Sequence, residues 1–456
     1  MQILKFASGA VLLAVFLAPT SYAATPAETM DAELRRLFPA NLPGAAVLVM
    51  KDGVTLLDKG YGLANVELQV PVQPGHVFYA ASVGKQFTAA AILRLVEDGK
   101  LTLQTPIRQY FPNVPASWNG ITVEHLLHHT SGIANLYTDA GFRQHAFEPH
   151  TPQELLGQAI AMPLVGTPGK QFSYASVNYT LLAMIIEQVS GEKYEAYLAR
   201  QFFVPLRMVN TVFIQNAGLI KGLVTPYEQG PKLAVRWDSS LMFGGGSFAS
   251  TNADLARWTL ALQSGNVLKP ASVQAMTTAL TLSDGSHVAY GYGIRPHMLA
   301  GQPYIRSSGD IQGFHAEVAY LLQSRVLVSM LSNSEDTPKF GLLPAARRIA
   351  MIAAGLPLHP VVPKPVPDRV LQQRAGVYRH GEERYTFRAE HGRLMMQEPG
   401  SPTWEPLQPL SPTEFYYEAN SDFRIRFANS TDGHASSQWF EMHPLDDSTD
   451  PVFVKE

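Results

Sequence analysis

Two strand-like pairs enclose a long helical stretch in the first part of this chain, and that order constrains the fold more than any other feature. Residues 45–50 and 54–63 read as two strands joined by a turn, and residues 317–322 and 325–331 read as a second pair. The section between the pairs is mostly helical, broken by prolines and glycines. Strands at both ends with helices between them predict an α+β domain whose sheet is completed by distant chain segments.

A proline-dense segment near residue 360 divides the 456-residue chain, which is long enough for two domains. Residues 359–368 read His-Pro-Val-Val-Pro-Lys-Pro-Val-Pro-Asp, which is typical of a linker. The short segments that follow alternate apolar and polar residues between turns, which predicts a small β-sandwich or barrel. We therefore expect a domain at 24–358, a linker at 359–369 and an all-β appendage at 370–456.

The first 23 residues have the pattern of a secretory signal peptide. A basic residue at Lys5 precedes an apolar run from Ala10 to Ala18, and small residues end at Ala23. An uncleaved membrane anchor is the alternative, but the apolar run is short for crossing a bilayer. We expect residues 1–23 to be removed, leaving a secreted or periplasmic protein without an integral membrane span.

Composition excludes several classes of function. The chain has no cysteine, so disulfides, thiolate catalysis and cysteine metal sites are excluded. A net charge of −3 gives no basic excess, so we do not expect a nucleic-acid partner. His125 and His129 have a spacing that could place both on one metal ion, but no third ligand is indicated. We expect no metal and no cofactor, and a small-molecule or peptide substrate; the oligomeric state stays open.

Ser82 and Lys85 stand three residues apart at the start of an alanine-rich apolar run that reaches Val96. On a helix such positions share one face, so the hydroxyl and the amine can meet. A serine becomes a strong nucleophile when a neighbouring base takes its proton, and burial can adapt a lysine to that role. The alternative is a chance pair on a solvated helix. The phosphate-binding loop and the Gly-x-Ser-x-Gly elbow are not matched.

Two further segments can complement this pair. Tyr174 lies in a segment that leads into an apolar helix, and a phenol near a lysine can shuttle a proton; the alternative is that Tyr174 and Tyr179 are core aromatics. Residues 306–314 form a strand edge of small residues, which lets a substrate approach and offers N–H groups to an oxyanion. An ordinary loop-to-strand junction is the alternative there.

Taken in order, these segments resemble the serine β-lactamase and penicillin-binding protein superfamily, in the branch of class C β-lactamases, D,D-carboxypeptidases, D-amino-acid aminopeptidases and related esterases. The resemblance covers residues 28–355, and its motifs are Ser82-Val83-Gly84-Lys85 and residues 125–132, 172–179, 244–251, 313–314 and 331–333. It implies a β-lactamase/transpeptidase-like antiparallel sheet with flanking helices plus a helical subdomain. Residues 370–456 resemble the β-rich appendage of some members.

The resemblance implies Ser82 as the acylated nucleophile, Lys85 as its base partner and Tyr174 as a second general acid/base. It also implies an oxyanion hole made of the backbone N–H groups of Ser82 and Asp310. The expected function is that of an exported serine hydrolase that forms a covalent acyl-enzyme with D-amino-acid peptides, β-lactams or esters. The alternative is a sensor of penicillins or cell-wall fragments that is acylated without turnover.

Two positions depart from the family pattern. Ser176 stands where the family's Tyr-x-Asn motif has its amide, and Ser307-Ser308-Gly309 replaces the Lys/His-x-Gly motif. We expect Ser176, Ser307, Gly309 and Asp310 to bind substrate. Because the missing cation helps to hold a substrate carboxylate, we expect esters or neutral amides to be preferred. Strand alternation should turn the adjacent Arg306 to the other face of the sheet.

Overall fold

The computed structural model describes residues 24–216, 218–228, 230–335, 341–358, 362–380, 383–417, 420–429, 438–444 and 453–455. The predicted signal peptide at 1–23 lies outside these residues. Within them, no helix combines the length and the apolar character needed to cross a membrane.

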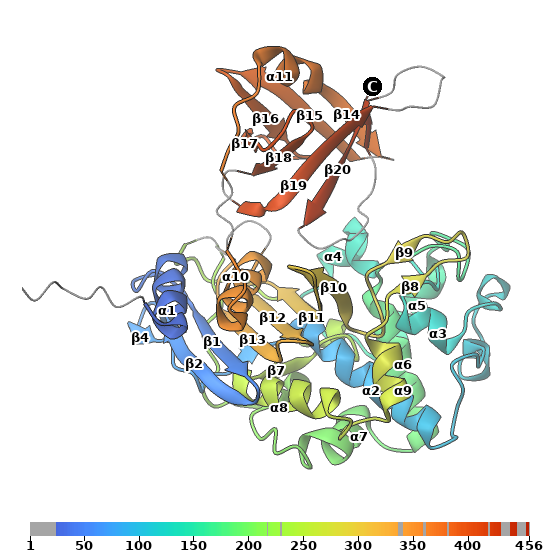
Figure 1. Ribbon diagram of the computed structural model, residues 1–456. Coiled ribbons are helices and arrows are strands. Elements are labelled where there is room, and N and C mark those ends of the chain that lie inside the picture. The colour runs from blue at the N-terminus through green and yellow to red at the C-terminus, as the bar shows by residue number, and fades with distance from the viewer. Residues whose placement is uncertain are drawn as a thin grey trace, which may run out of the picture.

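A six-stranded antiparallel sheet forms the centre of the larger unit, in the order β10-β11-β12-β13-β1-β2 (Figure 1). Strand β1 pairs with β13, for example Val49 opposite Val328, so the two ends of the predicted domain meet in mid-sheet. This confirms the α+β prediction and the completion of the sheet by distant segments. The strands are β1 (Ala45–Lys51), β2 (Val54–Tyr61), β10 (Arg295–Leu299), β11 (Gln302–Ile311), β12 (Phe314–Leu321) and β13 (Val326–Ser332).

Both faces of this sheet are covered. Successive side chains of a strand point to opposite faces, so Val47 and Val49 join one core while Ala46 and Leu48 join another. The first core is closed by α1 (Pro26–Leu37) and α10 (Leu343–Ala354), which pack against each other. The second lies between the sheet and the helical subdomain.

The helical subdomain is built around α2 (Lys85–Glu97) and α6 (Ser176–Ser190), which pack on each other. The first eleven residues of α6 are all buried, as expected for a helix in the middle of a core. Gly191 ends α6 in a left-handed conformation, φ 74°, which glycine adopts without strain. The other helices are α3 (Val123–Leu127), α4 (Ala140–Gln144), α5 (Pro152–Ala161), α7 (Tyr194–Leu198), α8 (Asn252–Gln263) and α9 (Pro270–Met276).

Short strands outside the central sheet form smaller sheets of two or three strands. They are β3 (Leu63–Asn65), β4 (Val70–Pro71), β5 (Phe78–Tyr79), β6 (Val212–Phe213), β7 (Phe248–Ser250), β8 (Leu280–Thr281) and β9 (His287–Val288). Strand β7 lies between β5 and β6 in a three-stranded sheet.

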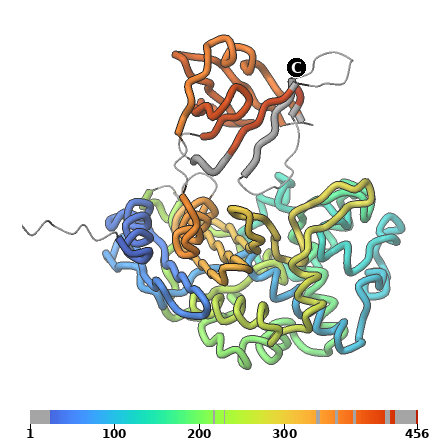
Figure 2. Tube along the Cα trace, in the orientation of Figure 1, coloured from blue at the N-terminus to red at the C-terminus, as the bar shows by residue number. Residues whose placement is uncertain are grey.

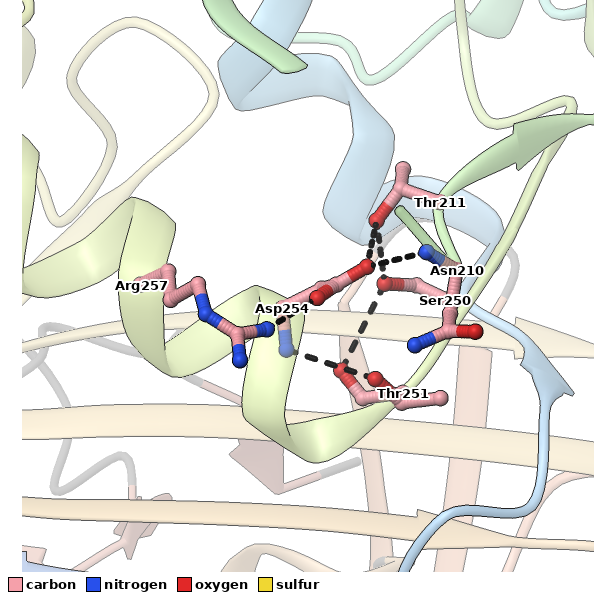
Figure 3. A network of polar contacts seen from close by, with 6 residues as sticks. All are labelled: Asn210, Thr211, Ser250, Thr251, Asp254 and Arg257. Atoms are coloured by element: carbon pink, nitrogen blue, oxygen red, sulfur yellow. Dashed lines mark hydrogen bonds and ion pairs between the residues drawn. The ribbon is translucent and has the colours of Figure 1, made fainter. Parts of the chain in front are cut away.

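A buried carboxylate fixes the start of α8 directly after β7. The Asp254 side chain is fully buried and accepts hydrogen bonds from the Asn210 N–H, at 2.7 Å, and from the Thr211 hydroxyl, at 3.2 Å. Figure 3 shows these contacts, the ion pair of Asp254 with Arg257, and the Thr251 hydroxyl that caps the helix. The network ties the β6 side of the small sheet to α8.

The C-terminal residues form an all-β unit, as predicted, and it closes as a barrel because β14 also pairs with β21 (Figures 1 and 2). Its core is rich in aromatic rings such as Tyr378, Phe387 and Phe427. Its elements are α11 (Asp368–Arg374), β14 (Gly376–His380), β15 (Glu383–Glu390), β16 (Arg393–Gln397), β17 (Glu405–Pro409), β18 (Glu414–Tyr417), β19 (Asn420–Asn429), β20 (Gln438–Pro444) and β21 (Phe453–Lys455).

The barrel recruits residues from the predicted linker at 359–369. Val366 packs against the barrel core, and α11 begins at Asp368. Leu358 packs instead against the core of the larger unit. We propose that the chain has two domains and that they are joined between Leu358 and Val366.

Candidate active site

Ser82 lies in a 3₁₀ turn, η1 (Ala81–Gly84), directly before α2 rather than at the start of the helix itself. The preceding residue, Ala81, has φ +43°, a left-handed conformation that costs a residue with a side chain about 1–3 kcal/mol. Two glycines pack against this turn. A Cβ on Gly309 would lie 2.2 Å from the carbonyl oxygen of Ala80, and one on Gly246 would lie 2.4 Å from that of Ala81. Any larger residue would displace the turn that holds the serine.

The structure brings together the three residues predicted to be catalytic. Lys85 Nζ lies 3.0 Å from Ser82 Oγ and donates to the carbonyl oxygen of Gly245 at 2.8 Å. The Tyr174 hydroxyl lies 3.0 Å from the same Ser82 Oγ. Lys85 is only 2% exposed, and its amine sits 4.9 Å from the centre of the Tyr174 ring. The serine hydroxyl therefore has a buried amine and a phenol within proton-transfer distance.

A buried histidine supports Tyr174. His129 is fully buried, its Nδ1 accepts the Ala175 N–H at 3.2 Å, and its Nε2 lies 3.1 Å from the Tyr290 hydroxyl. Its ring packs against that of Tyr174 with centroids 4.3 Å apart. Burial, followed by the nearby charges of Lys85 and Arg295, holds the His129 pKa well below its usual value. A neutral imidazole in this place orients the phenol, a role that the sequence analysis did not find.

His125, the other histidine considered for a metal, accepts the Thr122 N–H with its Nδ1 and caps α3. In the part of the chain that the structure describes, no group of three or more histidine, aspartate or glutamate side chains could hold a metal ion.

The predicted substrate-binding positions lie around this centre. Ser176 is 8% exposed and lines the cavity above the nucleophile. The Ser307 hydroxyl donates to the carbonyl oxygen of Gly293 at 3.1 Å. Gly309 packs on the nucleophile turn, as described above. The Asp310 carboxylate oxygen Oδ1 lies 2.5 Å from His315 Nδ1.

One edge of β11 is free beside the nucleophile. The pairing of β10 with β11 ends at Arg306, so the following residues of β11 run past η1 without a neighbour from β10. Free backbone groups at such an edge can receive a developing oxyanion. Arg306 makes two hydrogen bonds to the buried Glu317, at 2.7 and 2.6 Å. Its charge is thus paired with Glu317, and Arg306 does not line the cavity around Ser82.

Arg295 brings a cation into the cavity that the sequence analysis missed. It lines the same cavity as Ser82, Lys85 and Ser307, and its guanidinium lies 5.0 Å from the centre of the Tyr290 ring. Among the described residues, no carboxylate pairs with it. Arg295 lies near the Ser307 motif because β10 pairs with β11 and places Arg295 opposite Arg306. Predicting this strand pairing would have been the way to find Arg295 from the sequence. The motif position itself carries no cation, but Arg295 places one in the same cavity. This weakens the basis of the expected preference for neutral substrates, which stays a prediction.

The cavity has two lobes that share Ser82, Lys85, Tyr174 and Asp310. We call the first the arginine lobe; its other residues are Tyr290, Gly293, Arg295, Ser307 and Ser308. We call the second the aromatic lobe; its other residues are Tyr137, Ser176, Trp237, Asp238, Leu241, Met242, Gly245, Ile311 and Gln312. A substrate bound over Ser82 can therefore place one half in each lobe.

An antiparallel sheet beside a helical subdomain, with a Ser-x-x-Lys pair and a tyrosine at their junction, defines the β-lactamase and penicillin-binding protein class of fold. A family profile described as Beta-lactamase matches residues 32–351, and the chain belongs to this family. The resemblance found in the sequence is thereby confirmed.

The chain is similar in sequence to proteins from two bacteria. Protein flp of Staphylococcus aureus (strain MRSA252) is 31% identical over 231 residues, which are 48% of this chain and 45% of that protein. The chain thus matches less than half the length of flp. The putative penicillin-binding protein PbpX of Bacillus subtilis (strain 168) is 29% identical over 299 residues, 64% of this chain and 71% of PbpX.

Two solved structures have the same fold. The octameric penicillin-binding protein homologue from Pyrococcus abyssi has a TM-score of 0.65 and 24% identity, covering 94% of this chain and 99% of that one. The D-amino acid amidase from Ochrobactrum anthropi SV3, complexed with L-phenylalanine amide, has a TM-score of 0.61 and 21% identity, covering 72% and 97%.

Proposed function

We propose that this protein is a serine hydrolase that cleaves amides or esters through a covalent acyl-enzyme on Ser82. The observation that carries the proposal is the position of Ser82 Oγ, 3.0 Å from both Lys85 Nζ and the Tyr174 hydroxyl, at the floor of a two-lobed cavity. A nucleophile with two proton-transfer partners in hydrogen-bond reach is the arrangement that acyl transfer requires.

In the first half-reaction, Lys85 takes the Ser82 proton while Oγ attacks the substrate carbonyl carbon. The carbonyl oxygen becomes an oxyanion, which the N–H groups of Ser82 and Asp310 can stabilise at the free edge of β11. Tyr174 gives its proton to the leaving amine or alcohol as the bond breaks. The tyrosinate then recovers a proton from the protonated Lys85, which leaves an ester on Ser82.

In the second half-reaction, a water molecule attacks the ester carbonyl and gives a proton to the Tyr174–Lys85 pair. Collapse of the tetrahedral intermediate returns a proton to Ser82 Oγ and releases the acid. His129 keeps Tyr174 in place throughout, through its contacts with the Tyr174 ring and the neighbouring backbone.

We also propose that the protein is exported, with residues 1–23 removed and the mature chain secreted or periplasmic. The basic, apolar and small-residue pattern of the N-terminus supports this. A natural substrate among D-amino-acid peptides, D-amino-acid amides, β-lactams and esters is supported by the family and by the chain's similarity to a putative penicillin-binding protein and a D-amino acid amidase.

The test is acylation followed by turnover in the purified mature chain. With p-nitrophenyl acetate, we expect a burst of nitrophenol and a mass increase of one acetyl group on the peptide that contains Ser82. Ser82→Ala should abolish both, and Lys85→Ala should be nearly as severe, because residues that act as one unit lose function together. Ser264→Ala, which removes a hydroxyl at the end of α8, is the control and should behave like the wild type.

Retention of the acyl group in Ser82→Ala would refute the assignment of the nucleophile. A stable acyl-enzyme without steady-state hydrolysis, with penicillins as with esters, would show a sensor instead of an enzyme.

A further inference from the structure

The two lobes differ in charge, and this difference indicates which charges a substrate carries on either side of its scissile bond. Lys85 and Asp310 line both lobes, so they do not distinguish them. The arginine lobe adds the guanidinium of Arg295, whereas the aromatic lobe adds the carboxylate of Asp238. A substrate complementary to both lobes is negative on one side of the scissile bond and positive on the other.

The Asp238 carboxylate is fixed in the aromatic lobe. Its Oδ1 accepts the Ser240 N–H at 2.9 Å, which caps the short helix that carries Leu241 and Met242 into the same lobe. Among the described residues no lysine or arginine pairs with Asp238. Its charge is therefore held next to the cavity by the backbone and is not neutralised by a neighbour.

Gln312 supplies an independent observation. This residue also lines the aromatic lobe, and its Oε1 is buried without a hydrogen-bond donor in the described structure. A buried acceptor left without a donor costs about 1–3 kcal/mol, so it is normally satisfied by a ligand or a water molecule. The missing partner must be a donor.

Aromatic rings complete this environment. The ring centroids of Tyr137 and Trp237 lie 5.4 Å apart. The Tyr137 hydroxyl donates to the carbonyl oxygen of Leu241 at 2.5 Å. Ring faces attract cations, and rings also bury apolar side chains. A carboxylate, an unsatisfied acceptor and two rings together favour an ammonium group attached to an apolar or aromatic side chain.

We propose that the aromatic lobe binds the acyl half of an amino acid amide, amino acid ester or short peptide with a free amino terminus, and that Asp238 and Gln312 bind its ammonium group. This rests on the proposed acyl transfer by Ser82. The arginine lobe then receives the leaving half. Asp238 and Gln312 are specificity residues in this scheme and take no part in the proton transfers.

The experiment compares three kinds of p-nitroanilide that share one side chain: phenylalanine p-nitroanilide in its D and L forms, its N-acetyl derivative, and 3-phenylpropionic p-nitroanilide. The last lacks the amine without adding bulk, so it separates loss of charge from steric exclusion. For the better enantiomer we expect kcat/KM to exceed that of the 3-phenylpropionic compound by about tenfold or more, the value of one charge-assisted hydrogen bond.

Asp238→Asn keeps the oxygen that caps the short helix and removes the charge. We expect it to lower kcat/KM for the free amine about tenfold while leaving the 3-phenylpropionic compound nearly unchanged. Gln312→Met, of similar volume without an acceptor, should shift the same ratio in the same direction. Asp139→Asn is the matched control, because Asp139 caps α4 in the same way and is not among the residues lining either lobe.

Equal losses for all three substrates in Asp238→Asn would overturn the proposal, since they would show a structural role of this loop. A wild-type preference for the N-acetyl or 3-phenylpropionic compound would also overturn it. Acetylation of Ser82 by p-nitrophenyl acetate is measured in parallel. If that reaction fails, it is the proposed function that is wrong and not the ammonium site alone.

Discussion

Arg295 offers the sharpest test of how this site holds a negative charge. Its guanidinium lines the cavity, stacks on Tyr290 and has no carboxylate partner among the described residues. A charge-assisted hydrogen bond to a substrate carboxylate contributes about 1.5–3 kcal/mol. Arg295→Gln should therefore weaken transition-state binding of a carboxylate-bearing leaving group by roughly ten- to a hundredfold.

The assay uses two substrates with the same scissile bond, a dipeptide with a free C-terminal carboxylate and the same dipeptide with a C-terminal amide. We expect Arg295→Gln to reduce kcat/KM for the first and to leave the second within about threefold. The packing of Arg295 on Tyr290 is lost equally for both substrates, so the ratio isolates the charge. Lys170→Gln, an exposed cation that donates to Ser283, is the control for a general loss of positive charge.

An unchanged ratio would refute this reasoning. It would mean that Arg295 only packs on Tyr290 and forms part of the cavity wall, and that a substrate carboxylate is bound elsewhere or not at all. The sequence-based expectation of a preference for neutral substrates would then regain its basis.

Two further predictions concern stability. Asp254→Ala leaves the Asn210 N–H, the Thr211 hydroxyl and Arg257 without their acceptor, so we expect a loss of about 2–3 kcal/mol in the free energy of unfolding, measured in urea; a loss below about 0.5 kcal/mol would contradict the importance of this network. Burial lowers the pKa of His128 from 6.5 to about 4, so between these values the unfolded chain binds a proton that the folded chain does not. Stability should therefore fall as the pH drops from about 6.5 to about 4, and His128→Gln should flatten that part of the curve; an identical slope in the variant would exclude His128 as the cause.

The sheet and the Ser82–Lys85 pair could be predicted because each depends on a local pattern. A short apolar run followed by turn residues marks β1 and β2. The three-residue spacing of the pair keeps the two side chains within reach even though Ser82 lies in a 3₁₀ turn. The turn itself was not predictable. It depends on the packing of Gly309 and Gly246 against η1, which brings together segments far apart in the sequence.

The other charged, polar and aromatic residues that line the cavity were harder to find for the same reason. Arg295 reaches the cavity through strand pairing, and Asp238 reaches it on a loop with no regular spacing from the motifs. Gln312 lies within the 306–314 segment, but its sequence position did not indicate that its side chain lines the cavity. In the sequence, Trp237 is one apolar residue among many. Only the structure shows that its ring lies beside that of Tyr137 in the cavity wall. Local patterns therefore located the reacting atoms, and the tertiary structure was needed for the groups that select a substrate.

The pairing of β1 with β13 also has a consequence for how the chain acquires its structure. The partner of Val49 is Val328, so the middle of the sheet cannot assemble until nearly the whole domain has been synthesised. Closing so long a loop makes folding slow, and meanwhile the edge of β1 that β13 will occupy remains unpaired, although β2 can already pair with the other edge. Such a chain depends on being kept from aggregating before it folds, and the same delay would suit the proposed export, for which a chain has to stay extended.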